Sequence, residues 1–405
     1  MADTFSSAAA LIALRSPVDP VVCLRPHLIR ACARRMLAEF PGDVLYAVKC
    51  NDAPEVLRAL WSGGVREFDT ASIGEVRVVR RLLPAARCHF MHPVKGVDAI
   101  AEAYRLHGVR RFVCDHPDEL AKIAAATGGA EDLELLIRLA VPGEGAVLAL
   151  TGKFGAGVAE AGALVRAARD HAGRVGITFH VGSQCGDPQA YARAIGLVAE
   201  VVREAGPIDD LDLGGGFPAA YRGDEPPFAT FVAAIRTALA EHGLACRLQC
   251  EPGRALVAEG ASALARIELR RGDALYLNDG VFGNLAELKW IGPRFPMRVV
   301  RPARHANATC RGFDLFGPTC DSFDAMPGPH RLPADIADGE WLEIGMMGAY
   351  SNAMRTGFNG FASEPPAILL RQSGVWAPRG KKCVTRRIRK ENIRYSARYD
   401  GESED

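Results

Sequence analysis

A lysine closes the apolar run Val44-Leu45-Tyr46-Ala47-Val48. Lys49 follows Tyr46, Ala47 and Val48. A lysine that ends an apolar strand points into a poorly hydrated mouth, where desolvation lowers the pKa of the amine and leaves its lone pair free to attack a carbonyl carbon. A lysine whose stem lies on apolar surface with its ammonium in water explains the residue equally well when it is taken alone. Lys49 therefore indicates carbonyl chemistry only if other groups converge on it.

Two further polar residues that could take part in chemistry end later strand-like runs. His180 closes the run before Val181-Gly182-Ser183, and Glu251 precedes Pro252-Gly253-Arg254. An imidazole at a strand end can stack on a planar ring, and a carboxylate there can face a ring nitrogen and keep it protonated. A protonated pyridine ring is the electron sink that decarboxylation requires. A structural histidine and an ion pair at the rim are the alternatives for the two residues taken singly.

Three consecutive glycines follow another run, in Leu213-Gly214-Gly215-Gly216-Phe217-Pro218. Glycines let backbone N–H groups converge on an anion such as a phosphate, and the hydroxyl of Ser183 is a candidate to join them. The segment is neither a Walker loop, because no Gly-Lys-Ser/Thr follows, nor a dinucleotide-binding GxGxxG. A flexible loop is the simpler explanation of the glycines alone.

The elements that position these residues alternate between strands and helices. Eight β-rich runs are predicted at Val44–Lys49, Glu67–Thr70, Cys88–His92, Arg111–Asp115, Leu133–Val141, Ile177–Val181, Asp209–Gly214 and Cys246–Glu251. Amphipathic helices are expected between them, at Ala53–Trp61, Ser72–Leu83, Val97–His107, Pro117–Thr127, Ala159–His171, Pro188–Ala205 and Phe228–His242. This rhythm predicts a (β/α)8 barrel with its active site at the carboxyl ends of the strands, and a doubly wound open sheet is the main alternative.

A second, mostly β domain is expected after the barrel. Strand-like runs punctuated by Pro and Gly are predicted at Ala261–Arg270, Asp273–Leu277, Met297–Arg301 and Trp341–Ile344. The predicted division is a barrel over residues 26–256, a β domain formed by residues 1–25 with 257–378, and a flexible charged tail over 379–405.

Composition narrows the class of protein. The chain has 405 residues, a net charge of +1 and 24% charged residues. This balance gives no reason to expect nucleic acid or a membrane surface as a partner. We find no apolar run long enough to span a bilayer and no signal peptide, and we expect a cytoplasmic protein. The 11 cysteines contain no CxxC pair, so buried free thiols are expected in place of disulfides or a metal site.

Together these segments resemble the fold-type III pyridoxal-phosphate decarboxylases, which act on ornithine, lysine, arginine and diaminopimelate and share their barrel with alanine racemases. The resemblance extends from residue 46 to residue 361 through ordered motifs: YAVKCN, FDTASIGE, HPVK, KFG, FHVGSQ, LGGGFP, EPGR, YLNDG, GPTCDS, GAY and FNGF. It implies pyridoxal 5'-phosphate as the cofactor and a barrel of the alanine racemase type.

The resemblance also implies a role for each matching residue. Lys49 would hold the cofactor as a Schiff base, His180 would stack on its ring, and Glu251 would pair with the ring nitrogen, where the racemases place an arginine. Asp69 and Arg138 would line the cofactor site. The expected phosphate ligands are Ser183, Gly214, Gly215, Gly216, Arg254 and Tyr350.

In the second domain, Cys320 resembles the residue that protonates the α-carbon after CO2 leaves. Asp321 resembles the carboxylate that binds the distal amine of the substrate, and Phe358 is expected to line the substrate site. In this family the residues matched by Cys320 and Asp321 reach into the active site of a partner subunit. The resemblance therefore implies a homodimer with composite active sites.

Cys320-Asp321-Ser322 resembles the ornithine/lysine branch and departs from the CESGD-type signature of the diaminopimelate enzymes. The bacterial relatives tend to carry an aspartate about where Glu287 stands. The longer glutamate would shorten the space for the substrate, which favours ornithine over lysine. We therefore expect decarboxylation of L-ornithine to putrescine, as in polyamine biosynthesis. Lysine or 2,4-diaminobutyrate decarboxylation, a racemase and a non-catalytic regulator are the alternatives.

Overall fold

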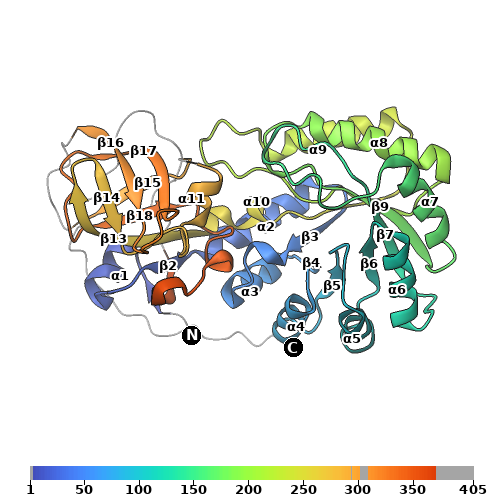
Figure 1. Ribbon diagram of the computed structural model, residues 1–405, viewed down its shortest axis with the longest axis horizontal. Coiled ribbons are helices and arrows are strands. Elements are labelled where there is room, and N and C mark those ends of the chain that lie inside the picture. The colour runs from blue at the N-terminus through green and yellow to red at the C-terminus, as the bar shows by residue number, and fades with distance from the viewer. Residues whose placement is uncertain (1–2, 293, 302–308, 371–405) are drawn as a thin grey trace.

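The protein is described by a computed structural model that covers residues 3–292, 294–301 and 309–370. Figure 1 shows a barrel surrounded by helices and, beside it, a unit built mainly of strands. The eight barrel strands are all parallel and close in the order β11-β12-β3-β4-β5-β6-β7-β9. Their bounds are β3 Asp43–Ala47, β4 Glu67–Thr70, β5 Arg87–Phe90, β6 Arg111–Cys114, β7 Glu134–Arg138, β9 Arg174–Thr178, β11 Asp210–Asp212 and β12 Arg247–Cys250.

Each predicted barrel strand is present, so the closed barrel is confirmed and the open sheet is wrong. The helices that surround it are α2 Pro26–Glu39, α3 Pro54–Ser62, α4 Ile73–Leu82, α5 Val97–His107, α6 Pro117–Thr127, α7 Val158–Ala168, α8 Gln189–Ala205, α9 Phe228–Glu241 and α10 Arg254–Val257. Local signals set their ends. Ser72 accepts a hydrogen bond from the backbone of Glu75 at the start of α4, and the left-handed glycines Gly108 and Gly128 end α5 and α6.

The second unit is a sheet with the strand path β1-β19-β2-β13-β14-β16-β17, to which β18 and β15 attach through β13. Its strands are β1 Thr4–Phe5, β2 Val21–Leu24, β13 Ala261–Arg271, β14 Ala274–Leu277, β15 Met297–Val300, β16 Cys310–Phe316, β17 Ala325–Pro333, β18 Trp341–Gly345 and β19 Glu364–Leu369. Helices α1 Ala8–Arg15 and α11 Ala286–Trp290 accompany them. The pairing of β2 with β13 brings the N-terminal segment into this sheet, as the sequence predicts. The boundaries proposed at 26–256 and 257–378 stay a prediction, and the tail 379–405 lies outside the described residues.

Short irregular elements connect these units. Strands β8 Ala146–Leu148 and β10 Ser183–Cys185 pair outside the barrel. Single 3-10 turns occur at η1 Val48–Cys50, η2 Ala258–Gly260, η3 Asn352–Met354 and η4 Phe358–Gly360. The backbone N–H of Arg25 donates to Gly260 O at 2.7 Å, so the two places where the chain passes between barrel and sheet are hydrogen-bonded to each other.

Nine cysteines of the described part of the chain are free, and all of these except Cys246 and Cys320 are buried. Cys310 is disulfide-bonded, so the expectation of free thiols is wrong at this residue. Among the residues with a described structure, we find no helix that is both long enough and apolar enough to cross a membrane.

Candidate active site

Lys49 lies at the carboxyl-end rim of the barrel, in the 3-10 turn that directly follows β3. Its Nζ donates to Oδ2 of Asp69 on the neighbouring strand β4 at 3.0 Å. The Lys49 side chain is 43% exposed, whereas Asp69 is 2% exposed. Partial desolvation disfavours the ammonium, but the carboxylates of Asp69 and Glu251 outweigh it and raise the pKa of Lys49. The predicted lowering of this pKa is therefore wrong for the protein without its cofactor.

The turn that carries Lys49 is fastened to the second unit. The buried side-chain amide of Asn51 donates to Gly348 O at 2.8 Å, and the backbone N–H of Tyr350 donates to Cys50 O at 2.9 Å. Tyr350 has a left-handed backbone with φ of 54°, which is uncommon outside glycine. The Gly348-Ala349-Tyr350 segment thus reaches the barrel rim, and the expected role of Tyr350 as a phosphate ligand stays a prediction.

His180 follows β9 and presents a neutral imidazole. Its Nδ1 accepts a hydrogen bond from the backbone N–H of Gly182 at 3.0 Å, which leaves the ring proton on Nε2. Burial and the positive charges of Arg138 and Lys49 hold the pKa of His180 well below its ordinary value. A neutral ring at this place is suited to stack on an electron-poor aromatic ring.

The glycines after β11 form a backbone cradle with no room for side chains. A Cβ on Gly214 would lie 2.0 Å from Phe179 O, on Gly215 2.6 Å from Glu251 O, and on Gly216 2.3 Å from Gly182 O. Gly214 and Gly216 also have positive φ. The hydroxyl of Tyr191 on α8 donates to Gly215 O at 2.9 Å and so holds the backbone of the cradle in place. Glycine at these positions is a steric requirement, which excludes the explanation by flexibility alone.

Arg254 begins α10 beside this cradle. Its guanidinium donates to the hydroxyl of Tyr221 at 2.9 Å and to that of Ser183 at 3.2 Å, and it lies 5.0 Å from the ring of Tyr350. It also forms a buried ion pair with Glu287 on α11. Glu287 is thus placed at the expected phosphate end of the site. Its role at the far end of the substrate stays a prediction, which this contact does not support.

Glu251 follows β12 and is 4% exposed. Its Oε1 has no hydrogen-bond partner among the described residues. Burial and the neighbouring carboxylates of Asp212 and Asp69 raise the pKa of Glu251 well above its ordinary value. Because a buried carboxylate oxygen without a donor is costly, this geometry favours a ligand that brings an N–H or a positive charge.

These groups fit pyridoxal phosphate. The amine of Lys49 matches its aldehyde, the face of His180 matches its ring, and the carboxylate of Glu251 matches its pyridine nitrogen. Its phosphate matches the glycine cradle with Ser183 and Arg254, whose Nε also has no partner among the residues described.

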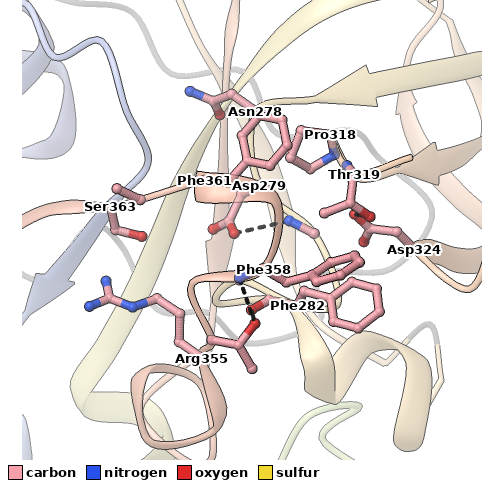
Figure 2. Close-up of a pocket in the computed structure, with 14 residues that line it drawn as sticks. Asn278, Asp279, Phe282, Pro318, Thr319, Asp324, Arg355, Phe358, Phe361 and Ser363 are labelled. Atoms are coloured by element: carbon pink, nitrogen blue, oxygen red, sulfur yellow. Dashed lines mark hydrogen bonds between the residues drawn. The ribbon is translucent and has the colours of Figure 1, made fainter. Parts of the chain in front are cut away.

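The second-domain candidates lie on an exposed turn. Cys320 and Asp321 follow β16, and both are exposed. The Cys320 thiol lies 3.4 Å from Oδ1 of Asn359, and Oδ1 of Asp321 accepts from the backbone of Phe323. Phe358 is 41% exposed and stands at the small pocket of Figure 2, with its ring centroid 4.7 Å from that of Phe282. The structure thus brings the barrel candidates together. The hydrogen bonds described for Cys320 and Asp321 join them only to residues of the second unit.

Comparison with known proteins decides the family. Residues 27–258 match the pyridoxal binding domain of the pyridoxal-dependent decarboxylases, and residues 249–348 match the C-terminal sheet domain of the same enzymes. The chain belongs to the pyridoxal-dependent decarboxylase family. It is therefore a carboxy-lyase that uses pyridoxal phosphate, and the racemase alternative is set aside.

Relatives of this decarboxylase differ in their substrates. A lysine/ornithine decarboxylase of Selenomonas ruminantium is 31% identical over 361 residues, which is 85% of each chain. The lysine/ornithine decarboxylase of Vibrio vulnificus, solved with putrescine, has a TM-score of 0.75 at 30% identity and covers 90% of this chain and 99% of that one. The Paramecium bursaria Chlorella virus arginine decarboxylase, solved with agmatine, has a TM-score of 0.79 at 26% identity, with 89% and 98% covered.

Several contributors to the site of this decarboxylase are not predicted from the sequence. Asn51, Tyr191 and Tyr221 act through contacts with distant parts of the chain, and Asp212 accepts a hydrogen bond from Gly214 in the cradle. Asp212 had a detectable signal, because it is an acid two residues before the glycine cradle at the end of a predicted strand. Tyr191 and Tyr221 lie within or after amphipathic stretches, where a buried aromatic residue is ordinarily part of the core.

Proposed function

We propose that this decarboxylase converts a diamino acid to its diamine and CO2, with L-ornithine as the favoured substrate and putrescine as the product. The observation that carries the proposal is the Cys320-Asp321 pair on the exposed turn after β16. A thiol supplies a proton, and the adjacent carboxylate binds an amine at the far end of a substrate. Relatives named for lysine and ornithine support this class, and others named for ornithine alone support the preferred substrate.

In the proposed mechanism, bound pyridoxal phosphate supplies an electron sink for the bond that breaks. Lys49 would hold the cofactor through its amine, which would be the group that the amine of the substrate replaces and that releases the product. Glu251 faces the ring nitrogen as a hydrogen-bonding carboxylate, and His180 supports the ring from one face. Arg254, Ser183 and the glycine cradle anchor the phosphate. Cys320 gives a proton to the α-carbon once CO2 has left.

We further propose a homodimer in which Cys320 and Asp321 complete the active site of the partner subunit. Aromatic rings beside this turn support the proposal. Phe323, Phe358, Phe361 and Trp290 are each more than 40% exposed, and the ring centroids of Phe323 and Trp290 lie 6.2 Å apart. A cluster of exposed rings beside candidate active-site residues is typical of a surface that another protein covers.

A CO2-release assay tests the substrate. The purified protein, reconstituted with pyridoxal phosphate, is given ornithine, lysine, 2,4-diaminobutyrate and arginine in parallel, and the proposal expects the highest kcat/KM with ornithine. A higher kcat/KM with lysine or 2,4-diaminobutyrate would make that amino acid the preferred substrate and would keep the assignment to diamino acids. Turnover of arginine alone would contradict the assignment to diamino acids.

Subunit mixing tests the composite site. K49A and C320A are each expected to be almost inactive, but random reassortment of their subunits leaves half of the dimers with one intact site. Mixing equal amounts should therefore restore about a quarter of the wild-type activity. A mixture that stays as inactive as its components would show that Lys49 and Cys320 do not act across subunits.

A further inference from the structure

Two buried carboxylates from neighbouring barrel strands meet beneath the expected cofactor ring. Asp212 is the last residue of β11, and Glu251 follows β12. The strands are in register there, because Leu213 N donates to Gln249 O at 2.9 Å and Glu251 N donates to Gly214 O at 2.8 Å. Asp212 is 0% exposed. Bulk solvent therefore does not reach its carboxylate.

The hydrogen bonds of Asp212 and Glu251 indicate that these two side chains share a proton. Oδ1 of Asp212 accepts from the backbone N–H of Gly214 at 2.9 Å. Oδ2 of Asp212 and Oε1 of Glu251 have no donor among the residues described, yet the two side chains lie within hydrogen-bonding reach of each other. Two ionised carboxylates only accept hydrogen bonds, so this contact is favourable only when one of them is protonated.

The surrounding charges also favour one shared proton. Asp69, Lys49 and Arg138 face Glu251, while Arg111 and Asp69 face Asp212. Burial raises the pKa of Asp212 to about 6 and the pKa of Glu251 well above its ordinary range. A close pair of buried acids titrates as a unit, and the first proton is held far more tightly than the second.

We propose that Asp212 is a positioning residue that keeps the shared proton when cofactor is bound and donates a hydrogen bond through it to the carboxylate of Glu251. Glu251 then meets the pyridine nitrogen as a carboxylate and keeps that nitrogen protonated. The inference rests on the cofactor site proposed above. It gives Asp212 a role in tuning the ring without touching it.

The ring nitrogen itself reports the outcome. Pyridoxal phosphate labelled with 15N at the ring is bound to the wild type and to Asp212→Asn, Asp212→Leu and Glu251→Gln, and the nitrogen resonance is recorded at neutral pH. The asparagine amide still donates to Glu251 and its oxygen still accepts from Gly214, so D212N should keep the protonated-ring signal. D212L removes the donor and should shift the signal to that of E251Q, which defines the unprotonated ring. Retention of the protonated signal in D212L, or its loss in D212N, would overturn the proposal.

Infrared spectroscopy keeps the test independent of the leucine variant, which introduces an apolar side chain at a buried polar position. The wild-type holoenzyme should show a protonated-carboxyl C=O band that disappears in D212N. Asp210→Asn is the matched control, because Asp210 is also buried on β11 but pairs with Arg111 and Arg174. D210N should lower stability while leaving the band and the ring signal unchanged. Survival of the band in D212N would overturn the proposal, whereas a wild type that binds no cofactor would refute the cofactor site instead.

Discussion

Arg254 serves two anionic partners at one end of the active site. In the protein without cofactor its guanidinium pairs with Glu287, and both side chains are almost completely buried. The phosphate of the cofactor is expected to approach the same guanidinium. A carboxylate beside a phosphate repels it and also reduces the positive charge that attracts it. Glu287 thus stabilises Arg254 in its buried position at the expense of phosphate affinity.

The Glu287→Gln substitution should change stability and cofactor affinity in opposite directions. Without cofactor, an uncompensated buried Arg254 should lower the free energy of unfolding by about 3 kcal/mol. With cofactor, the freed guanidinium should bind the phosphate more tightly and lower the dissociation constant about tenfold. Urea unfolding of the apoprotein and equilibrium titration with pyridoxal phosphate measure the two effects.

Glu343→Gln is the matched control for this prediction. Glu343 is buried in the β unit and pairs with Arg25 and Arg298, away from the cofactor site. E343Q should also lower stability but should leave cofactor affinity unchanged. Equal or weaker cofactor binding in E287Q would show that the carboxylate does not compete with the phosphate.

At the scale of elements, the barrel is predictable because each strand is a short β-rich run between helical stretches. The strands β17 and β19 of the second unit escape prediction for an equally physical reason. β17 contains Pro327, Pro329 and Pro333 and lies at the end of the strand path, and β19 contains Pro365 and Pro366. Proline lacks the donor that a central strand needs, so proline-rich runs are interpreted as loops.

Some residues of the site can be predicted from the sequence, and the contacts of others cannot. Lys49, His180, Glu251 and the glycine cradle occur at strand ends and are visible in the sequence. The contact of Glu287 with Arg254 is not, because it joins α11 to the barrel rim through the folding of two units. The order of strands and helices predicts where the rim lies, whereas the partners across it depend on the tertiary packing.

Helix α8 is predicted to control the phosphate cradle through one hydroxyl. Tyr191→Phe keeps the ring that stacks on Phe217 at 4.8 Å but leaves the buried Gly215 O without its donor. The free energy of unfolding should fall by about 1–2 kcal/mol, and cofactor affinity should weaken several-fold. Y104F is the control, because the Tyr104 hydroxyl bonds Asp132 at the surface. Unchanged cofactor affinity in Y191F would show that the cradle holds its shape without α8.

At the scale of the whole molecule, the barrel interior at the end opposite the cofactor contains buried polar groups. His89 Nε2 lies 2.6 Å from Oε2 of Glu67, and Arg111 is also buried there. Burial, followed by the charge of Arg111, lowers the pKa of His89 to about 3. The folded protein thus keeps His89 neutral at a pH where the unfolded chain protonates it.

This difference predicts acid sensitivity. The stabilising contribution is present above pH 6.5, the ordinary pKa, and is lost as the pH falls toward 3 because the unfolded chain then binds the additional proton. Between pH 7 and pH 5 the wild type should lose up to about 2 kcal/mol through this residue. In urea unfolding, the free energy of unfolding of H89Q should fall by up to about 2 kcal/mol less than that of the wild type between pH 7 and pH 5. The exposed His171 supplies the control H171Q, and a pH profile of H89Q identical to that of the wild type would refute the assignment.

The attachment of the cofactor to Lys49 is the central claim, and chemical trapping tests it directly. Borohydride reduction of the reconstituted holoenzyme, followed by peptide mass mapping, locates the lysine that carries the pyridoxyl group. The expected result is a single label on Lys49, in the turn between β3 and α3, and no label in K49A. A pyridoxyl group on Lys95 or Lys153, or a protein that retains no label, would contradict the account.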